Sequence, residues 1–417
     1  MQKSENKKDT KQIPKSTFLQ EFFNRGFFAQ ATHLEELDEI LANQKITAYI
    51  GFDCTANCLH AGSLIQIMIL RMLQKHGHKV IVLLGGGTTK IGDPSGKDEA
   101  RQILNAEKIQ ENLNGIKRNL EKFISFEGEN AAMLVNNDDW LKNLNYIDFL
   151  RDIGKHFSIN RMLTFDSVKL RLEREQPLSF LEFNYMILQA YDFYELNKKH
   201  NCILQIGGSD QWGNIVNGVD LTRRITNKTA FGLTSPLLTT SDGKKMGKTA
   251  DGAVWLDENL LCAFDYFQYF RNVHDADVIK FLKLFTDLEI SQIEILSNLK
   301  DQEINKAKEI LAFEATKVCH GKIAANEALK KAQEIFINKN NNAFELKEVI
   351  GINKKLIEII KEIGGAQSNS EAKKLIEGKA VRINGELVLD VNFLIEKAGE
   401  FDLSVGKKKF FRVRVVS

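Results

Sequence analysis

The chain has 417 residues, of which 43% are apolar and 27% charged, and it contains only four prolines. This composition is typical of a folded soluble protein with two or three hydrophobic cores, and it excludes a disordered or fibrous chain. The formal net charge of +2 excludes a protein that is strongly acidic or basic as a whole.

The N-terminal segment MQKSENKKDTKQIPKS is polar throughout and lacks the apolar region of a signal peptide. The longest mostly apolar run, LIQIMILRML, is too short to span a bilayer. The five cysteines form no C-x-x-C pair, and Cys54 with Cys58 lacks the further partners of a zinc site. We predict a cytoplasmic protein with free thiols, no membrane contact, no protein-bound metal and a disordered leader over residues 1–17.

Four short apolar runs alternate with longer helical patterns in the first half of the chain. They are ITAYIGFD (46–53), KVIVLLGG (79–86), AAMLVNN (131–137) and CILQIGG (202–208). Strands separated by helical segments of ten or more residues are typical of a parallel sheet with helices on its faces. We therefore predict an α/β domain over residues 18–259.

Strand signals stop at Leu260, and helix-period segments follow one another, which predicts an all-helical domain over residues 260–336. The Asn-rich stretch INKNNNAF predicts a linker over residues 337–349. Two helical segments, an Asn-Gly hairpin in AVRINGELVLD and the strand FFRVRVV then predict a small α+β module over residues 350–417.

The C-terminal module is the basic part of the chain. Residues 353–417 carry 13 Lys and Arg against 9 Asp and Glu, and GKKKFFRVRV contains five cations and no acid. A charge cluster is usually a solvated face, but a basic chain terminus mixed with aromatic residues favours nucleic-acid binding.

The first strand carries polar groups toward its carboxyl end, the edge of an open α/β sheet where ligands bind. Strand alternation places Tyr49, Gly51 and Asp53 on one side, so that a phenol, a gap and a carboxylate share a face.

Thr55 follows this strand, and the segment HAGS, with His60 and Gly62, opens the next helix. A helix start with small residues and an imidazole suits a phosphate or a nucleotide base, because free N–H groups favour anions and glycine allows close approach. A lone histidine at a helix start is more often a cap or a surface residue, and this alternative stays open.

The second strand ends in GGGTTKIGDPSGKDEAR, which carries Asp93, Lys97 and Arg101. It is not a dinucleotide motif, because Lys90 occupies the position of the third glycine of G-x-G-x-x-G. A plain glycine-rich loop and a binding site are equally compatible with this segment.

The helix after Pro177 begins with a capping box made by Ser179 and Glu182. Tyr185, Gln189 and Asp192 follow at i, i+4 and i+7 and form one stripe. Because the flanking sequence is strongly apolar, we interpret this polar stripe as the wall of a small-molecule site.

The fourth strand ends in LQIGGSDQWGN, where Gly208 leaves space and Asp210 and Gln211 occupy the first turn of the next helix. Hydrogen-bond acceptors at this position fit a ribose.

The segment SDGKKMGKT combines lysines, glycines and a threonine in the manner of a phosphate-binding loop. It does not have P-loop spacing, because Asp242 occupies the position of the first glycine.

Together these motifs resemble the bacterial-type tyrosyl-tRNA synthetases, which are class I aminoacyl-tRNA synthetases, over nearly the whole chain from about Phe18. HAGS stands where the class has His-x-Gly-His, and KMGKT where it has Lys-Met-Ser-Lys-Ser. YIGFD, GDPSGK, YMILQAYD and LQIGGSDQWGN are similar to segments of the tyrosyl enzymes in this order. SEAKKLIEGKAVRINGE is similar to the S4-type RNA-binding fold.

The resemblance implies a Rossmann-like catalytic domain, a helical anticodon-arm domain and an S4-like domain. It implies that tyrosine and ATP, accompanied by Mg²⁺, give tyrosyl-adenylate, from which the tyrosyl group passes to the 3′ end of tRNA(Tyr). It also implies a homodimer. Its catalytic residues would be Thr55, His60, Lys245, Lys248 and Thr249. Tyrosine would be bound by Tyr49, Asp93, Tyr185, Gln189 and Asp192. ATP would be bound by Gly51, Asp53, His60, Gly62, Gly208, Asp210, Gln211, Lys97 and Arg101.

Three positions depart from the family pattern. Ser63 stands in place of the second motif histidine, Gly247 replaces the middle serine of the lysine motif, and Cys54 replaces a common proline. The latter two are expected to loosen the backbone more than to alter the chemistry.

Three alternatives remain open from the sequence alone. They are another α/β nucleotidyl transferase, a tryptophanyl enzyme, and an inactive synthetase-like RNA-binding protein.

Overall fold

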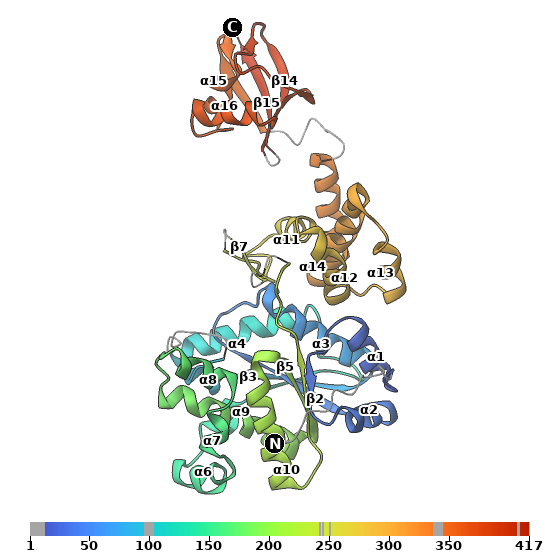
Figure 1. Cartoon of the computed structure of the whole chain (residues 1–417), viewed down its shortest axis with the longest axis vertical. Coiled ribbons are helices and arrows are strands. Elements are labelled where there is room, and N and C mark those ends of the chain that lie inside the picture. Colours follow the sequence, from blue (N-terminus) through green and yellow to red (C-terminus); the bar gives the residue numbers. More distant parts are fainter. Residues whose placement is uncertain are drawn as a thin grey trace. The chain divides into compact units, whose positions relative to one another are not determined.

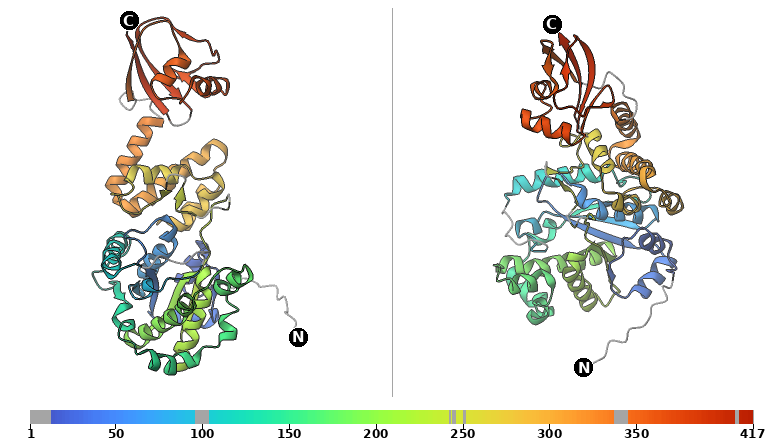
Figure 2. Two further views of the ribbon diagram at one scale, coloured as in Figure 1. Left: turned by 90° about the vertical axis from the view of Figure 1, so that its left-hand side faces the viewer. Right: turned by 45° about the horizontal axis from the view of Figure 1, so that its top comes forward.

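The computed structural model of the chain describes residues 13–95, 104–241, 243, 246–249, 252–336, 345–406 and 409–416. The chain divides into two compact units, residues 1–328 and residues 329–417, and each is described by itself (Figures 1 and 2). Of the predicted leader, residues 1–12 lie outside the described residues. Ser16 already belongs to the fold, because its hydroxyl accepts a hydrogen bond from Leu19 N and caps the first helix.

The first unit is built around a six-stranded sheet with the order β1-β6-β5-β2-β3-β4, in which only β1 is antiparallel. The strands are β1 (Gln30–Ala31), β2 (Thr47–Asp53), β3 (Lys79–Gly85), β4 (Met133–Asn136), β5 (Cys202–Gly208) and β6 (Phe231–Ser235). The four predicted strands and their parallel arrangement are confirmed. The strands β1 and β6 were not predicted, because β1 has two residues and the apolar run of β6 is only five residues long.

Helices cover this sheet (Figure 1). They are α1 (Thr17–Asn24), α2 (Leu34–Asn43), α3 (Leu64–Lys75), α4 (Ala106–Leu120), α5 (Asp138–Leu141), α6 (Tyr146–Asp152), α7 (Ile159–Met162), α8 (Asp166–Glu173), α9 (Phe180–His200) and α10 (Trp212–Thr226). Tyr49 and Ile81 share a core with Phe193 of α9 and Ile215 of α10, so these two helices cover the face that carries Tyr49. Because parallel crossovers are right-handed, α3, which connects β2 to β3, covers the opposite face.

The predicted all-helical character of this region is confirmed, since no strand occurs between residues 263 and 336, all of which are described; up to residue 328 the region belongs to the same compact unit as the sheet. Its helices are α11 (Ala263–Arg271), α12 (Val278–Phe285), α13 (Ile290–Leu296) and α14 (Ile304–Phe336), the last with a non-helical residue at Gly321. Helix α12 packs against α3. The guanidinium of Arg71 on α3 donates to both carboxylate oxygens of Asp287, which joins the helical segment to the sheet domain.

The second unit contains a five-stranded sheet with the order β12-β11-β14-β15-β9, and its core is aliphatic. Its elements are β9 (Glu345–Ile350), β10 (Lys354–Lys355), α15 (Leu356–Glu362), α16 (Asn369–Glu377), β11 (Val381–Ile383), β12 (Glu386–Leu387), β13 (Leu394–Ile395), β14 (Gly399–Val405) and β15 (Lys409–Val416). The predicted Asn-Gly hairpin joins β11 to β12, with positive φ at Asn384 (49°) and Gly385 (87°).

Two features of this unit differ from the sequence prediction. Strand β9 takes up the last residues of the predicted linker and pairs in parallel with β15, while residues 337–344 lie outside the described residues. The basic run of β15 also has acidic partners, because Arg412 and Arg414 form ion pairs with Asp402 and Glu400 across the sheet. The sequence did not reveal these pairs, because the acids lie on the neighbouring strand.

Candidate active site

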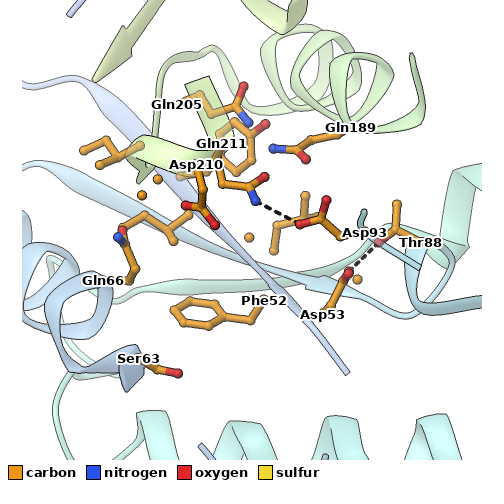
Figure 3. Close-up of a pocket in the computed structure, with 18 of the residues that line it drawn as sticks. Phe52, Asp53, Ser63, Gln66, Thr88, Asp93, Gln189, Gln205, Asp210 and Gln211 are labelled. Carbon is orange, nitrogen blue, oxygen red and sulfur yellow. Dashed lines mark hydrogen bonds between the residues drawn. The ribbon is translucent and has the colours of Figure 1, made fainter. Parts of the chain in front are cut away.

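A pocket of about 340 Å³ opens at the carboxyl ends of β2 and β5 (Figure 3). From β2 the chain continues to β3 and β4 on one side, and from β5 it continues to β6 on the other. The pocket therefore lies where the strand order reverses, the place where open α/β sheets bind ligands. Its volume lies within the range of small-molecule sites.

Tyr49 of β2 and Asp192 of α9 line this pocket together and are almost fully buried, with exposures of 1% and 2%. Asp192 accepts two hydrogen bonds, from Asn137 Nδ2 at 2.9 Å and from Trp140 Nε1 at 2.8 Å. The Tyr49 hydroxyl has no hydrogen-bond partner among the residues that the structure describes. A buried carboxyl group and a buried phenol with unused hydrogen-bonding capacity thus face one cavity.

Burial controls the ionisation of both groups. It raises the pKa of Asp192 to about 7, although the hydrogen bonds from Asn137 and Trp140 favour the charged form. Burial, together with the charge of Asp192, raises the pKa of Tyr49 well above its ordinary value. No cation forms a salt bridge with Asp192 in the described part of the chain, so its charge is stabilised only by neutral donors.

A second carboxylate, Asp53, ends β2 at the same pocket. It accepts hydrogen bonds from Thr88 Oγ1 at 2.9 Å and from the Tyr185 hydroxyl at 3.0 Å. A Cβ atom at Gly85 would lie 2.2 Å from Asp53 Oδ1. The absence of a side chain at Gly85 therefore leaves space for the Asp53 carboxylate. This close contact explains why a glycine occupies the end of β3.

A hydrogen-bonded group around Asp93 connects residues of the predicted tyrosine site with a residue of the predicted ATP site. Asp93 accepts hydrogen bonds from Gln211 Nε2 at 2.8 Å and from Ser95 N at 2.9 Å (Figure 3). Asn214 Nδ2 donates to Gln211 Oε1 at 3.1 Å and to Gln189 Oε1 at 2.9 Å. Gln211, predicted as an ATP ligand, is thus hydrogen-bonded to Asp93, predicted as a tyrosine ligand.

The remaining predicted residues fall into three sets. Thr55, Gly51, Gly62, Gly208 and Asp210 line the pocket, as does Ser63. His60 precedes a short 3₁₀ turn, and its Nδ1 accepts a hydrogen bond from Gly62 N at 3.0 Å, so it does act as a cap. Lys97, Arg101 and Lys245 lie outside the described residues, and of Lys248 and Thr249 only the backbone, as strand β7 (Lys248–Thr249), is described.

Several pocket residues were missed from the sequence. Thr88, Asn137 and Trp140 hold the two carboxylates, while Gln66 and Gln205 each line the cavity with a buried side-chain oxygen for which the described chain offers no donor. Asn137 could have been recognised, because it is the last residue of the third predicted strand, AAMLVNN (131–137), and so lies at the carboxyl edge of the sheet. Trp140 carried no such signal, since a tryptophan in a short helix is most often a core residue.

Within the described ranges, no group of three or more His, Cys, Asp or Glu side chains could hold a metal ion. None of the described helices combines the length and the apolar character needed to cross a bilayer.

Comparisons with known proteins bear on the nature of this site. The family model "tRNA synthetases class I (W and Y)" matches residues 41–337, and the model "S4 domain" matches residues 354–401. The chain is 56% identical over 410 residues to a tyrosine–tRNA ligase of Rickettsia bellii, covering 96% of this chain and 100% of that relative. It is 56% identical over 409 residues to a tyrosine–tRNA ligase of Ehrlichia ruminantium, covering 96% and 98%.

A solved structure agrees with this relationship. The C-terminally truncated mitochondrial tyrosyl-tRNA synthetase of Aspergillus nidulans superimposes with a TM-score of 0.69 at 29% identity. The match covers 76% of this chain and 94% of that structure.

The raised pKa of Asp192 predicts a pH-dependent stability. With a pKa of about 7 in the folded protein against an ordinary 3.8, folding favours the protonated form. The stabilisation is complete below about pH 4 and is lost as the pH rises through about 7. Relative to Asp192→Asn, the wild-type free energy of unfolding should therefore fall by up to about 1.4 kcal/mol per pH unit in that window.

Urea titrations at several pH values measure this difference. The exposed Asp139→Asn on the neighbouring helix is the control and should keep the wild-type slope. An Asp192→Asn protein with the same pH dependence as wild type would show that this carboxyl group does not titrate as described.

Proposed function

We propose which residues perform each part of the reaction from the premise that the chain belongs to the class I tRNA synthetases of the tryptophan and tyrosine group. Within this group it is a tyrosine–tRNA ligase. The reaction has two steps. The carboxylate of tyrosine attacks the α-phosphorus of ATP, and pyrophosphate leaves. The 3′-terminal ribose hydroxyl of the tRNA then attacks the tyrosyl carbonyl carbon, and AMP leaves.

Tyr49 and Asp192 would recognise the phenol of the substrate. This proposal rests chiefly on the Tyr49 hydroxyl, which is buried beside the cavity without a partner in the described chain, and on the buried carboxyl group beside it. Phenylalanine would leave the Tyr49 hydroxyl without a partner and the buried Asp192 carboxylate with only the donors Asn137 and Trp140, which is unfavourable beyond the missing contact. The tyrosyl enzymes are themselves the standard example of this rule.

Asp93, Tyr185 and Gln189 would hold the ammonium group of tyrosine. Asp93 supplies a carboxylate in the same pocket, and its hydrogen bond to Gln211 supports adding Gln211 to this set. Because the tyrosine carboxylate lies close to its ammonium group, Gln211 would lie between amino acid and ATP, which reconciles its two roles.

The protein would form no covalent intermediate, since the substrate carboxylate is itself the nucleophile. Catalysis would then consist of holding the reactants in place and stabilising charge on the phosphates. Thr55, His60, Lys245, Lys248 and Thr249 would stabilise that charge. Gly51, Asp53, Gly62, Gly208, Asp210 and Gln211 would seat ATP, with Lys97 and Arg101 as further phosphate ligands.

Mg²⁺ would accompany ATP and neutralise part of the phosphate charge. It would be held mainly by phosphate oxygens and water.

The S4 unit would bind the RNA backbone. Lys374 on α16, Lys379 after this helix and Arg382 on β11 are exposed, whereas Lys373, Arg412 and Arg414 have acidic partners. The exposed cations are therefore better placed than β15 to contact phosphates. We also propose a cytosolic location, supported by five cysteines that are all free thiols.

The chain would form a homodimer through the segment from α6 to the start of α9. This segment carries nine exposed large apolar residues, among them Ile147 (67% exposed), Ile159 (63%) and Phe180 (70%). The full set is Tyr146, Ile147, Leu150, Ile159, Leu163, Leu170, Leu172, Phe180 and Leu181. Such a concentration within 36 residues is typical of an interface, and a second copy of the chain is the occupant proposed here.

Asp192→Ala should weaken tyrosine binding while the KM for ATP stays near the wild-type value. A hydrogen bond to a charged group is worth about 1.5–3 kcal/mol, which corresponds to an affinity loss of roughly 10- to 150-fold. Tyrosine-dependent ATP–pyrophosphate exchange and tyrosine titrations measure both quantities. The absence of exchange with tyrosine in the wild type would refute the activity of this site.

Tyr49→Phe is the matched variant. It should weaken tyrosine binding by a smaller factor without lowering the free energy of unfolding, because the hydroxyl has no partner in the described protein. Equal tyrosine affinity in both variants and wild type would refute the assignment of the phenol pocket.

Removal of residues 345–417, which include β9, should lower the rate of aminoacylation by more than about tenfold and change the rate of pyrophosphate exchange much less. The reason is that phosphate contacts of the S4 unit contribute to RNA affinity and not to adenylate formation. Both rates are measured on the same preparation. Equal losses in the two assays would contradict a role confined to RNA.

Ile159→Asp combined with Phe180→Asp should convert the dimer to a monomer in sedimentation equilibrium, because two buried charges would be desolvated at the interface. Ile323→Asp is the control, since Ile323 is equally exposed (77%) but lies outside the segment. A monomeric wild type would exclude the dimer.

A further inference from the structure

Trp140 lies between the buried Asp192 carboxyl group and a lysine at the protein surface. Its indole Nε1 donates a hydrogen bond to Asp192 Oδ1 at 2.8 Å. Lys199 Nζ lies over the same ring, 4.7 Å from its centroid. Trp140 is 7% exposed, whereas the Lys199 side chain is 43% exposed. The indole therefore contacts a carboxyl group through its N–H and a cation through its face.

Helix α9 and a neighbouring carboxylate fix the position of Lys199. Asp192, Glu195 and Lys199 fall at i, i+3 and i+7 on this helix and so share one stripe of its surface. Lys199 Nζ forms an ion pair with Glu195 Oε2 at 2.9 Å, and the Tyr191 hydroxyl donates to Glu195 Oε1 at 2.9 Å. Because Glu195 is buried and bound at both oxygens, it holds the ammonium group at the face of Trp140.

The cation affects the indole as a hydrogen-bond donor. A lysine over an aromatic face is attracted by the negative face of the ring. It also withdraws electron density from the ring, so the N–H becomes a stronger donor, because polar contacts in series strengthen one another. Burial raises the pKa of Asp192 to about 7, and the hydrogen bond from Trp140 opposes this rise. A stronger indole donor therefore favours the charged form of Asp192.

Lys198 makes a similar contact with a different ring. Its Nζ lies 5.8 Å from the centroid of Tyr194. In the described chain the side chains that donate to the Asp192 carboxylate are those of Asn137 and Trp140. Lys198 thus repeats the contact between a cation and an aromatic face on a ring that does not donate to Asp192.

We propose that Lys199 is a positioning residue for recognition of the tyrosine phenol, and that it acts by polarising the Trp140 N–H toward Asp192. This inference rests on the proposed role of Asp192 in binding the phenol. The cation strengthens the indole hydrogen bond, and the carboxylate so stabilised accepts a charge-assisted hydrogen bond from the phenol hydroxyl. Lys199 does not line the pocket, so it acts on the amino acid only through Trp140.

Lys199→Met tests this proposal, with Lys198→Met as the matched control and Lys199→Arg as the conservative variant. Methionine keeps much of the aliphatic chain and removes the charge, whereas arginine keeps a cation that can lie over an indole. The measured quantities are the Kd for tyrosine, the KM for ATP in pyrophosphate exchange and the ¹H shift of the Trp140 indole N–H. The chain has three tryptophans, and Trp140→Phe assigns this signal.

Lys199→Met should raise the Kd for tyrosine about two- to fivefold, the factor expected for one exposed contact between a cation and an aromatic face. The KM for ATP should stay within about 1.5-fold of wild type. The Trp140 indole proton should move to higher field, because its hydrogen bond weakens. Lys199→Arg should keep most of the tyrosine affinity, and Lys198→Met should match wild type in all three quantities. Wild-type tyrosine affinity or an unchanged Trp140 signal in Lys199→Met overturns the proposal.

A double-mutant cycle with Trp140→Phe separates two routes open to the Lys199 charge. Burial and, to a smaller extent, the Glu195 charge raise the pKa of Asp192, and Lys199 is paired with Glu195. If Lys199 acts through the indole, Lys199→Met weakens tyrosine binding in the wild-type background and not in Trp140→Phe. An equal factor in both backgrounds overturns the proposal, since Lys199 would then act by offsetting the Glu195 charge.

Asp192→Ala separates this inference from the proposed function. If Asp192→Ala binds tyrosine as tightly as wild type, the assignment of the phenol pocket itself is wrong. If Asp192→Ala weakens tyrosine binding and Lys199→Met does not, only the role of Lys199 is refuted.

Discussion

The burial of Asp192 without a cationic partner is the constraint on which the site depends. A carboxyl group that is 2% exposed is unfavourable in its charged form unless fixed donors replace water. Asn137 and Trp140 supply two such donors from the segment that follows β4. The phenol of a tyrosine substrate would supply a third, so that substrate binding itself stabilises the charge. Selectivity for tyrosine would then follow from this unfavourable burial of a charged group, which an apolar ring cannot relieve.

The sheet topology makes this burial possible, because it brings distant segments to one edge. β2 contributes Tyr49 and Asp53, the chain after β4 contributes Asn137, and α9 contributes Asp192. These segments meet beside the reversal point between β2 and β5, where the pocket opens. Asp53 also requires a glycine at position 85, since a Cβ atom at Gly85 would overlap the Asp53 carboxylate. The polar wall therefore depends on the strand order and on the absence of a side chain at Gly85.

Much of this arrangement was predictable from periodic patterns. The stripe of Tyr185, Gln189 and Asp192 and the alternation through Tyr49 both identified side chains that line the observed pocket. What remained hidden were contacts between segments with no common local pattern. Trp140 donates its indole N–H to Asp192, and Arg412 pairs with Asp402 of the neighbouring strand β14; no local sequence pattern indicates either contact. Local periodicity reports which face a residue occupies, whereas the partner across a sheet or pocket depends on tertiary structure.

The two halves of the site require opposite mechanical properties. Discrimination of tyrosine from phenylalanine would need a rigid wall around the buried carboxylate, and Asp192 is held by buried donors on both of its oxygens. Phosphate binding would need cations that reach a highly charged ligand and later release pyrophosphate, which lysines on a loop could do. Such a loop is useful only if its resting position is near the reactants. In the described part of this segment, Gly247 lies in close contact with Gly62 at the turn that follows His60.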